Sequence, residues 1–333
     1  MEHLIERLIN DQDVATAELK RIFGELCEGR PYPPEQLAAL LVLMRTRGET
    51  AEQLAGLAET ILEQAVPIDV PAHATTIGGT GGDYAGTFNI STAAALLTAA
   101  CGVPVAKHGN RAVSSQCGSG DVLEALGIPV DLGPDEARRT LDEHGFVFLA
   151  APVYLPAFRY IAPVRAALKV PTIFNIIGPL LHPGHLKRQI IGVFDRSLQY
   201  KMAEALLRLG HVHTLVVTSA DGLDEITLTG PTYAKEVAGG RIADMAIDPG
   251  DFGFATCSTQ ELAGGDATEN AQIIREIFAG AKGPKSDCAI LNAGFALYVS
   301  GKVTTPFEGV ELARSVQQSG AALSFLNRLC GLG

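Results

Sequence analysis

"GTGGDYAGTFNISTAAALLTAACG", residues 79–102, joins a glycine-rich loop directly to an alanine-rich helix. Glycine accepts positive φ angles and has no Cβ, so this loop can bring its backbone close to a ligand. Ser91 and Thr92 stand at the start of the helix, where free backbone N–H groups attract an anion. We therefore predict a phosphate-binding loop, with a structural turn and helix cap as the alternative. The spacing matches neither the P-loop nor the dinucleotide-binding fingerprint.

A strand, a polar or glycine-rich loop and a helix follow one another along much of the remaining chain. Apolar strands are expected at 103–109, 145–152, 189–195 and 213–222, and helices at 91–102, 197–210 and 270–281. This alternation predicts an α/β domain with a mostly parallel central sheet over residues 71–333. In such sheets ligands bind at the carboxyl ends of the strands, which is where the unusual motifs of this chain fall.

The first seventy residues show only helical patterns and predict a small all-helical domain, 1–70. Pro33 and Pro34 suit the start of a helix that Gly48 ends. Thr50 and Gln53 have the spacing of a capping box at the start of the next helix. The density of alanine and leucine predicts helices that pack on one another or on a second subunit.

The proline-rich middle segment, near 160–185, is partly helical in pattern. It can belong to the α/β domain or return to the helical one, and we favour the return. Arg165 would then face the strand-end loops across a cleft.

Composition narrows the class of protein. A chain of 333 residues with 47% hydrophobic and 19% charged residues can bury a large core. Its formal net charge of -11 argues against nucleic acid as a partner, because binding the phosphate backbone needs a basic surface. No apolar run reaches the ~20 residues of a membrane span, so we expect no membrane partner and a cytoplasmic location. The six cysteines lack metal-ligand spacing, which predicts reduced, mostly buried thiols.

Two further loops carry polar groups suited to phosphate chemistry. "KHGNRAVSSQCGSGD", residues 107–121, follows a predicted strand and interleaves cations, an amide and serine hydroxyls with glycine. This composition suits a ligand with more than one phosphate. "DGLDEI", residues 221–226, places Asp224 and Glu225 at the end of another strand. Adjacent acids are suited to Mg²⁺ if the other loops bind phosphates, and otherwise form a solvated surface.

Five motifs in order carry a resemblance to a known family: "GTGGDYAGTFNIST", "KHGNRAVSS", "NIIGPLLHP", "DGLDEI" and "GGDATENAQIIREIFAG". Together they closely resemble the anthranilate phosphoribosyltransferase family, and the resemblance runs nearly end to end. It implies a fold similar to that of pyrimidine-type nucleoside phosphorylases, with a small helical domain and a large α/β domain hinged around the active-site cleft. It also implies a homodimer formed through the helical domains.

The reaction that the resemblance implies belongs to tryptophan biosynthesis. The 5-phosphoribosyl group of phosphoribosyl pyrophosphate passes to the amine of anthranilate, and pyrophosphate is released. Because an aromatic amine is unprotonated at neutral pH, we expect no essential general base. Catalysis then depends on positioning and electrostatics, with Lys107 at the leaving group, Arg165 on the anthranilate carboxylate and Asn110 orienting the acceptor.

The resemblance assigns site residues position by position. Those matching the family's phosphoribosyl pyrophosphate contacts are Gly79, Gly82, Asp83, Thr87, Asn89, Ile90, Ser91, Thr92, Lys107, His108, Gly109, Asn110, Arg111, Ala112, Val113, Ser114, Ser115 and Ser119. Those matching its anthranilate site are Gly79, Asn110, Arg165 and, beside the pocket, His108. Those matching its Mg²⁺ ligands are Ser91, Asp224 and Glu225.

Two positions depart from the family pattern. Leu155 stands where a histidine usually lies on the path of the aromatic substrate, and Tyr84 stands where a small residue usually follows "GTGGD". These differences leave open a phosphoribosyltransferase for another aromatic acceptor. A pyrimidine-type nucleoside phosphorylase is a further alternative, which the acidic pair and the double serine disfavour. A non-catalytic ligand-binding protein is the alternative from a different class.

Overall fold

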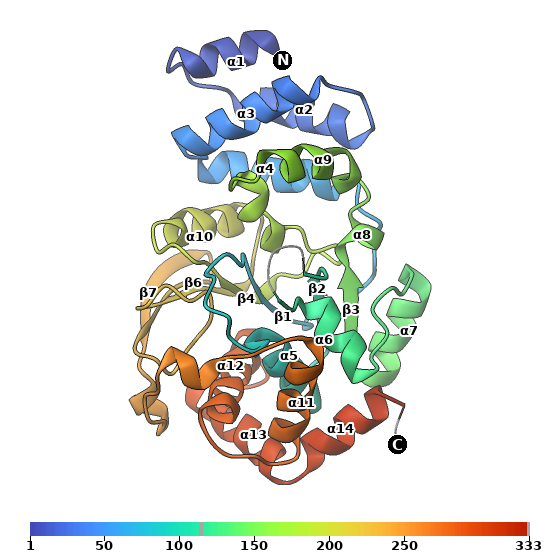
Figure 1. The fold of residues 1–333 in the computed structure, drawn as a ribbon. Coiled ribbons are helices and arrows are strands. Elements are labelled where there is room, and N and C mark those ends of the chain that lie inside the picture. Colours follow the sequence, from blue (N-terminus) through green and yellow to red (C-terminus); the bar gives the residue numbers. More distant parts are fainter. Residues whose placement is uncertain (113–115, 332–333) are drawn as a thin grey trace.

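Four helices open the chain and form one end of the molecule: α1 (Glu2–Ile9), α2 (Thr16–Cys27), α3 (Pro34–Arg47) and α4 (Ala51–Leu62) (Figure 1). The computed structural model describes residues 1–112 and 116–331. Pro34 is the first residue of α3, and Gly48 ends that helix with a φ of 78°. Thr50 and Gln53 exchange both capping-box hydrogen bonds, each 3.1 Å long. The predicted start and end of α3 and the predicted start of α4 are therefore confirmed.

The middle segment lies on the helical end of the molecule. It contains most of α9 (Phe158–Leu168) and the short 3-10 turns η1 (Ile173–Asn175) and η2 (Gly178–Leu180), and the short α8 (Ala151–Tyr154) precedes it. Ile161 and Val164 of α9 share an apolar core with α2 and α3, and the ring of Phe174 lies 5.9 Å from that of Phe23. Figure 1 shows α9 beside α4.

A mixed sheet forms the centre of the α/β part. β1 (Thr76–Gly79), β4 (Arg188–Gly192) and β5 (His213–Ser219) run parallel, and β6 (Thr232–Ala238) and β7 (Arg241–Ile247) follow as antiparallel strands. β2 (Val105–Gly109) pairs in parallel with β3 (Phe146–Ala150), and a bridge between Thr75 and Val105 joins this pair to β1. The predicted α/β class with a mostly parallel sheet is confirmed.

Two parts of the sheet were not among the predicted strands, β1 and the β6–β7 hairpin, and the hairpin carries a sequence signal of its own. Its turn is Gly239–Gly240, and both glycines have positive φ, 55° and 74°. Two-residue hairpin turns of the favoured type require positive φ at both positions, so this Gly-Gly pair between alternating strands was a readable signal.

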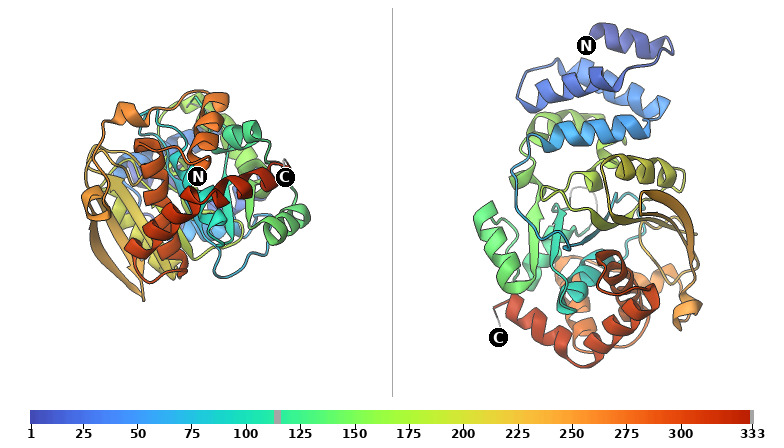
Figure 2. Two further views of the ribbon diagram at one scale, coloured as in Figure 1. Left: turned by 90° about the horizontal axis from the view of Figure 1, so that it is seen from below. Right: turned by 180° about the vertical axis from the view of Figure 1, so that it is seen from behind.

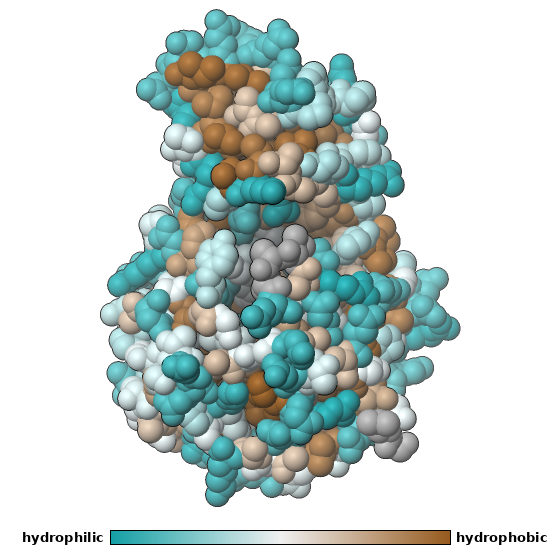
Figure 3. Space-filling model, in the orientation of Figure 1, coloured by the Kyte–Doolittle hydropathy of each residue, from teal (hydrophilic) through white to brown (hydrophobic). Residues whose placement is uncertain are grey.

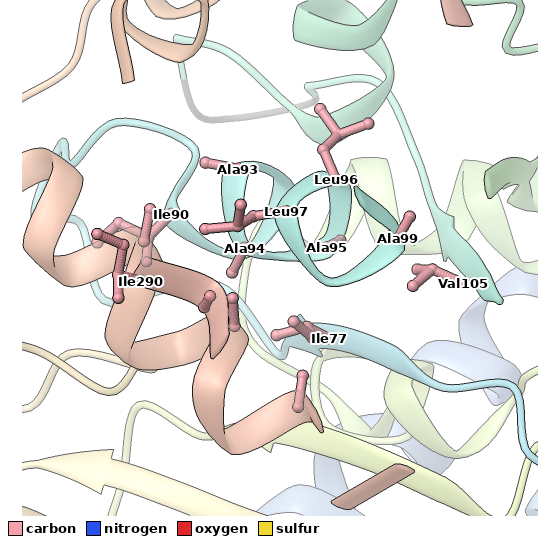
Figure 4. Packing of buried hydrophobic residues seen from close by; sticks show 14 of the residues in the cluster. Ile77, Ile90, Ala93, Ala94, Ala95, Leu96, Leu97, Ala99, Val105 and Ile290 are labelled. Atoms are coloured by element: carbon pink, nitrogen blue, oxygen red, sulfur yellow. The ribbon is translucent and has the colours of Figure 1, made fainter. Parts of the chain in front are cut away.

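Both faces of the parallel strands are buried, which explains their continuous apolar runs. Ile190 of β4 faces one core and Ile191 the other, as the two-residue period of a strand requires. Figure 4 shows the first core, where the alanine-rich α5 (Ile90–Ala100) packs between β1 and α12 (Pro284–Ser300). The small alanine side chains let α5 approach its neighbours closely.

The remaining helices cover the sheet. They are α6 (Ser119–Leu126), α7 (Pro134–His144), α10 (Leu198–Arg208), α11 (Ala267–Phe278), α13 (Pro306–Gln318) and α14 (Ala321–Leu329), with short 3-10 turns η3 (Pro249–Phe252) and η4 (Thr259–Leu262). The two termini lie at opposite ends of the molecule (Figure 2). Within the described ranges, no helix combines the length and the apolar character that a membrane crossing needs.

Replacing Gly309 of α13 with alanine is expected to destabilise the fold. A Cβ at this position would lie 2.1 Å from the backbone oxygen of Gly294 in α12, and neither backbone can move away freely. Overpacking of this kind costs ~1–3 kcal/mol, which exceeds the ~1 kcal/mol that alanine gains over glycine in a helix. Urea unfolding should show a lower free energy of unfolding for Gly309→Ala.

The matched control for this change is Gly24→Ala in α2. Here a Cβ would meet only the side chain of Thr60, at an ordinary contact distance of 3.5 Å. This variant should be as stable as the parent protein or more stable. Equal losses in the two variants would contradict the steric explanation.

Candidate functional site

A cavity of about 380 Å³ opens where β1, β2 and β4 end. The strand ends contribute Gly79, Lys107 and His108, and Asn110 follows β2. Arg165 of α9 lines the same cavity from the helical side. The cavity therefore brings together the glycine loop, the basic loop and the middle segment, which are far apart in the sequence.

The acidic pair reaches the glycine loop through a close backbone approach. The N–H of Gly81 donates a 2.6 Å hydrogen bond to Asp224 Oδ2. A Cβ on Gly79 would lie 2.4 Å from the same oxygen, and a Cβ on Gly192 would lie 1.5 Å from the backbone oxygen of Asp224. Both glycines are therefore needed for packing inside the protein, whereas Gly81 has a positive φ of 65° and open space around it.

A buried lysine lies beside the acids. Lys107 is 1% exposed, and its Nζ donates to the backbone oxygen of Ile77 (2.5 Å) and to Ser91 Oγ (3.3 Å). The N–H of Ser91 donates to Glu225 Oε1 at 3.3 Å. Burial lowers the pKa of Lys107, and the nearby carboxylates Glu225 and Asp224 act against this shift. One cation is thus shared by two acids.

Burial raises the pKa of both Asp224 and Glu225, and it outweighs the opposing effect of Lys107 on Glu225 and of the hydrogen bond from the Gly81 N–H on Asp224. The charge of Asp83 raises the pKa of Asp224 further, and the charge of Asp224 does the same for Glu225. Carboxylates in this state favour an additional cation. Two carboxylates and the hydroxyl of Ser91 are hard oxygen ligands, and Mg²⁺ commonly takes few protein ligands and completes its shell with phosphate oxygens and water.

The donor set therefore fits Mg²⁺. Within residues 1–112 and 116–331, no group of three or more His, Cys, Asp and Glu side chains is arranged around a common metal position.

The predicted contacts divide into two groups by position. Those that line the cavity are Gly79, Ser91, Lys107, His108, Gly109, Asn110, Arg111, Ser119 and Arg165. Those that lie in the same loops and strands but not on its wall are Gly82, Asp83, Thr87, Asn89, Ile90, Thr92, Ala112, Asp224 and Glu225. Val113, Ser114 and Ser115 lie outside the described residues.

The side chains of Arg111 and Thr92 are not available to a ligand in this structure. The guanidinium of Arg111 makes ion pairs with Glu124 (3.2 Å) and Asp131 (2.7 Å). Thr92 is fully buried, and its hydroxyl has no hydrogen-bond partner among the described residues. The two positions that depart from the family pattern lie in different surroundings. Leu155 is buried on the cavity wall, whereas Tyr84 is 88% exposed.

Sequence reasoning missed some residues that support the site. The amide of Asn270 in α11 donates to Asn89 Oδ1 at 2.9 Å, and "GGDATEN" gives no local signal for this contact. His182, in "GPLLHP", binds the backbone of β2 next to Lys107. Phe158, Phe174 and Asn175 line the cavity from the middle segment, where no periodic pattern pointed to them.

His182 is held in one tautomer. Its Nε2 donates to the backbone oxygen of Ala106 (2.7 Å), because a carbonyl can only accept, and its Nδ1 accepts from the N–H of Gly184 (3.1 Å). Its ring lies edge-on to that of His108, with centroids 5.5 Å apart. Burial lowers the pKa of His182 to about 4 and that of His108 to about 3, so both rings are neutral at pH 7.

Comparison with known proteins connects this geometry to a family. Residues 2–65 match the glycosyl transferase family, helical bundle domain, and residues 72–323 match the glycosyl transferase family, a/b domain. Anthranilate phosphoribosyltransferase of Rubrobacter xylanophilus is 44% identical over 318 residues, which cover 95% of this chain and 93% of the relative. The chain belongs to the anthranilate phosphoribosyltransferase family.

Solved structures of the family agree with this placement. The crystal structure of anthranilate phosphoribosyltransferase from Thermus thermophilus has a TM-score of 0.92 and 40% sequence identity, with 98% of each chain covered. A Saccharomyces cerevisiae anthranilate phosphoribosyltransferase in complex with PRPP and Mg has a TM-score of 0.88 and 26% identity, covering 98% of this chain and 96% of that chain. The resemblance to the anthranilate phosphoribosyltransferase family is confirmed.

His182→Gln is expected to reduce the loss of stability in acid. The unfolded state binds a proton near pH 6.5 and the folded state only near pH 4, so the stability that His182 confers at pH 7 is lost as the pH falls through this window. Between pH 7 and pH 5 the loss amounts to ~2 kcal/mol. A glutamine keeps a donor for Ala106 but does not titrate.

The measurement is the free energy of unfolding in urea at pH 7 and at pH 5. The difference between the two values should be smaller in His182→Gln than in the parent protein. His3→Gln, on the exposed surface of α1, is the control and should leave the difference unchanged. If the loss of unfolding free energy between pH 7 and pH 5 is equal in all three proteins, His182 takes up its proton as readily in the folded state as in the unfolded state.

Proposed function

We propose that this chain transfers the 5-phosphoribosyl group of phosphoribosyl pyrophosphate to the amine of anthranilate, as in tryptophan biosynthesis. The proposal rests mainly on one observation: a single cavity has one side suited to a phosphorylated donor and another side suited to an aromatic carboxylate. Its strand-end side holds the glycine loop and Lys107, and its helical side holds Arg165 beside aromatic rings. The family relatives that carry this enzyme name support the same reaction.

Arg165 is suited to hold the carboxylate of the acceptor. It is partly buried, and among the described residues no carboxylate forms an ion pair with it. Its guanidinium carbon lies 5.7 Å from the centre of the Phe174 ring. A guanidinium in this position can bind a carboxylate with two parallel hydrogen bonds. The ring of anthranilate would lie against Leu155 and Phe158, which line the same cavity.

The donor would lie across the strand ends. Gly81 and Gly82 have positive φ, 65° and 89°, and form a loop whose backbone is open to a ligand. Ser91 lies in the first turn of α5, where the positive end of the helix dipole favours negative charge. Lys107 brings a positive charge to the same edge. These groups together suit a ribose that carries a phosphate and a pyrophosphate.

In the reaction, the amine nitrogen forms a bond to the anomeric carbon of ribose while the bond to pyrophosphate oxygen breaks. The electron pair of the broken bond leaves with pyrophosphate, and the new ammonium loses its extra proton afterwards. Positive character develops on the ribose carbon and negative charge on the leaving group. The chain contributes by holding the two substrates in line and by stabilising the leaving pyrophosphate through Lys107.

Mg²⁺ completes the proposal as a cofactor. Asp224, Glu225 and Ser91 are the residues that would hold it, for the reasons of charge and ligand type given above. When bound, Mg²⁺ supplies positive charge that neutralises the pyrophosphate.

We assign residues 1–70, with the segment near 160–185, to a dimerisation domain and residues 71–333 to the catalytic domain. The apolar surface on the helical end of the molecule supports a homodimer through this domain (Figure 3). An apolar cavity of about 680 Å³ lies there between the loop that follows α2 and α9. The proposed small-molecule reaction suits a cytoplasmic location without a membrane partner, and the acidic net charge argues against nucleic acid as a partner.

The decisive experiment follows the fluorescence of anthranilate with the purified protein, phosphoribosyl pyrophosphate and Mg²⁺, each omitted in turn. We expect fluorescence to fall only when all components are present. The same assay with other aromatic amines tests whether Leu155, in place of the family's usual histidine, changes the preferred acceptor. A preference of tenfold or more in kcat/KM for another amine would replace anthranilate as the acceptor. Phosphorolysis of uridine or thymidine without Mg²⁺ would overturn the transferase assignment.

Arg165→Ala is expected to raise the KM for anthranilate. The bond to the carboxylate exists in the bound substrate and in the transition state alike, so kcat should change less than KM. A hydrogen bond to a charged group contributes ~1.5–3 kcal/mol, which corresponds to ~10- to 100-fold in KM. The KM for phosphoribosyl pyrophosphate should stay within about twofold.

Arg159→Ala is the control on the same helix. Arg159 is exposed, and its guanidinium lies over the ring of its neighbour Tyr160 instead of in the cavity. This variant should keep both KM values. An unchanged KM for anthranilate in Arg165→Ala would remove Arg165 from the acceptor site.

A further inference from the structure

The amide of Asn270 has all its hydrogen-bonding groups engaged, and its orientation is fixed. Asn270 lies on α11 and is 2% exposed. Its Oδ1 accepts from the backbone N–H of Gly265 (2.9 Å), and its Nδ2 donates to the backbone oxygen of Gly265 (3.1 Å). Its Nδ2 also donates to Asn89 Oδ1 (2.9 Å), across 181 positions of sequence. Because a backbone N–H can only donate, the oxygen of Asn270 must face Gly265, and its nitrogen must face Asn89.

This arrangement fixes the amide of Asn89 in turn. Its oxygen must face Asn270, and it also accepts from Cys117 Sγ (3.3 Å). Its Nδ2 donates one hydrogen to the backbone oxygen of Cys117 (3.3 Å). The second N–H of Asn89 has no acceptor among the described residues. Asn89 stands immediately before α5, at the end of the glycine loop and two residues before Ser91, which lines the cavity.

The backbone segments that carry these side chains are locked together. The N–H of Gly264 donates to the backbone oxygen of Gly86, and the N–H of Phe88 donates to that of Leu262, each at 2.9 Å. A Cβ on Gly264 would lie 2.6 Å from the Cα of Phe88 and 2.5 Å from Asn270 Oδ1. The glycine pair that precedes α11 thus allows Asn270 to reach the phosphate loop.

We propose that Asn270 is a positioning residue for the phosphoribosyl donor. By taking the oxygen of Asn89, it leaves Asn89 able to act on the ligand only as a hydrogen-bond donor. A donor suits an oxygen of phosphate or of the ribose hydroxyls, whereas an amide oxygen would repel a phosphate. The inference rests on the proposed function, because it takes phosphoribosyl pyrophosphate as the ligand of this loop.

Asn270→Asp tests the proposal with little change in shape. A carboxylate still accepts from the N–H of Gly265, but it can donate neither to Asn89 nor to the backbone oxygen of Gly265. The amide of Asn89 must then turn its nitrogen toward residue 270, which places its oxygen against the backbone oxygen of Cys117 and near the phosphates. We expect the KM for phosphoribosyl pyrophosphate to rise ~10-fold or more, the scale of a hydrogen bond to a charged group. The KM for anthranilate should stay within about twofold.

Gln317→Glu is the matched control. Gln317 is an equally buried amide of the same core, on α13, and its Nε2 donates to the backbone oxygens of Ile277 (2.8 Å) and Ala281 (3.2 Å). It has no contact with the glycine loop. The control should lose thermal stability and keep both KM values. If Asn270→Asp does not fold, Asn270→Ser is measured in the same way, since serine is smaller and adds no charge.

A selective rise in the KM for phosphoribosyl pyrophosphate supports the proposal. Unchanged KM values, or equal rises in both KM values, would overturn it and leave Asn270 a purely structural residue. Calorimetric titration of the parent protein and the variant with phosphoribosyl pyrophosphate and Mg²⁺, without acceptor, tests the role of Asn270 separately from the proposed function. Donor binding by the parent protein without anthranilate turnover would contradict the proposed acceptor and still report on Asn270. Absence of donor binding by the parent protein would overturn both.

Discussion

The contact of Asp224 with two glycines is the constraint on which the site depends. The strand ends at Gly79 and Gly192 approach Asp224 so closely that no Cβ fits at either position. This approach lets the carboxylate accept from the N–H of Gly81 and brings Glu225 to the first turn of α5. A side chain at either glycine would push the acidic pair away from the glycine loop.

The same approach brings charges together at a cost to stability. Lys107 and Asp224 are buried, and two acids share one lysine, so each carboxylate is less stable in its charged form than it would be in water. The cores on the two faces of the sheet must offset this cost. α5 belongs both to this core and to the site, because its alanine-rich part packs on α12 while Ser91 in its first turn lines the cavity. A site that lacks enough positive charge by itself is suited to a substrate that arrives with a metal cation.

The sequence predicted the parts of the fold that local patterns encode. Strands followed by polar loops, the Thr50 capping box and the end of α3 at Gly48 depend on residues close together in the chain. The bond between Asn270 and Asn89 could not be predicted in this way, because it joins two elements that only the tertiary fold brings together. Gly79 shows a different limit. Its lack of a side chain was readable, but the sequence suggested a nearby ligand where the structure has a protein carboxylate.

The side of the cavity proposed for the acceptor has few polar groups with which to distinguish one substrate from another. In the proposed reaction Arg165 would be the group there that selects for charge, whereas Leu155, Phe158 and Phe174 line the cavity with apolar surface. An apolar wall distinguishes substrates by only ~10- to 200-fold for each methylene group, whereas a buried polar group rejects a substrate that cannot pair with it. Leu155 contributes no such polar group. Selection of the acceptor therefore depends on its carboxylate and its flat ring, and ring substituents are tolerated as far as the walls give them room.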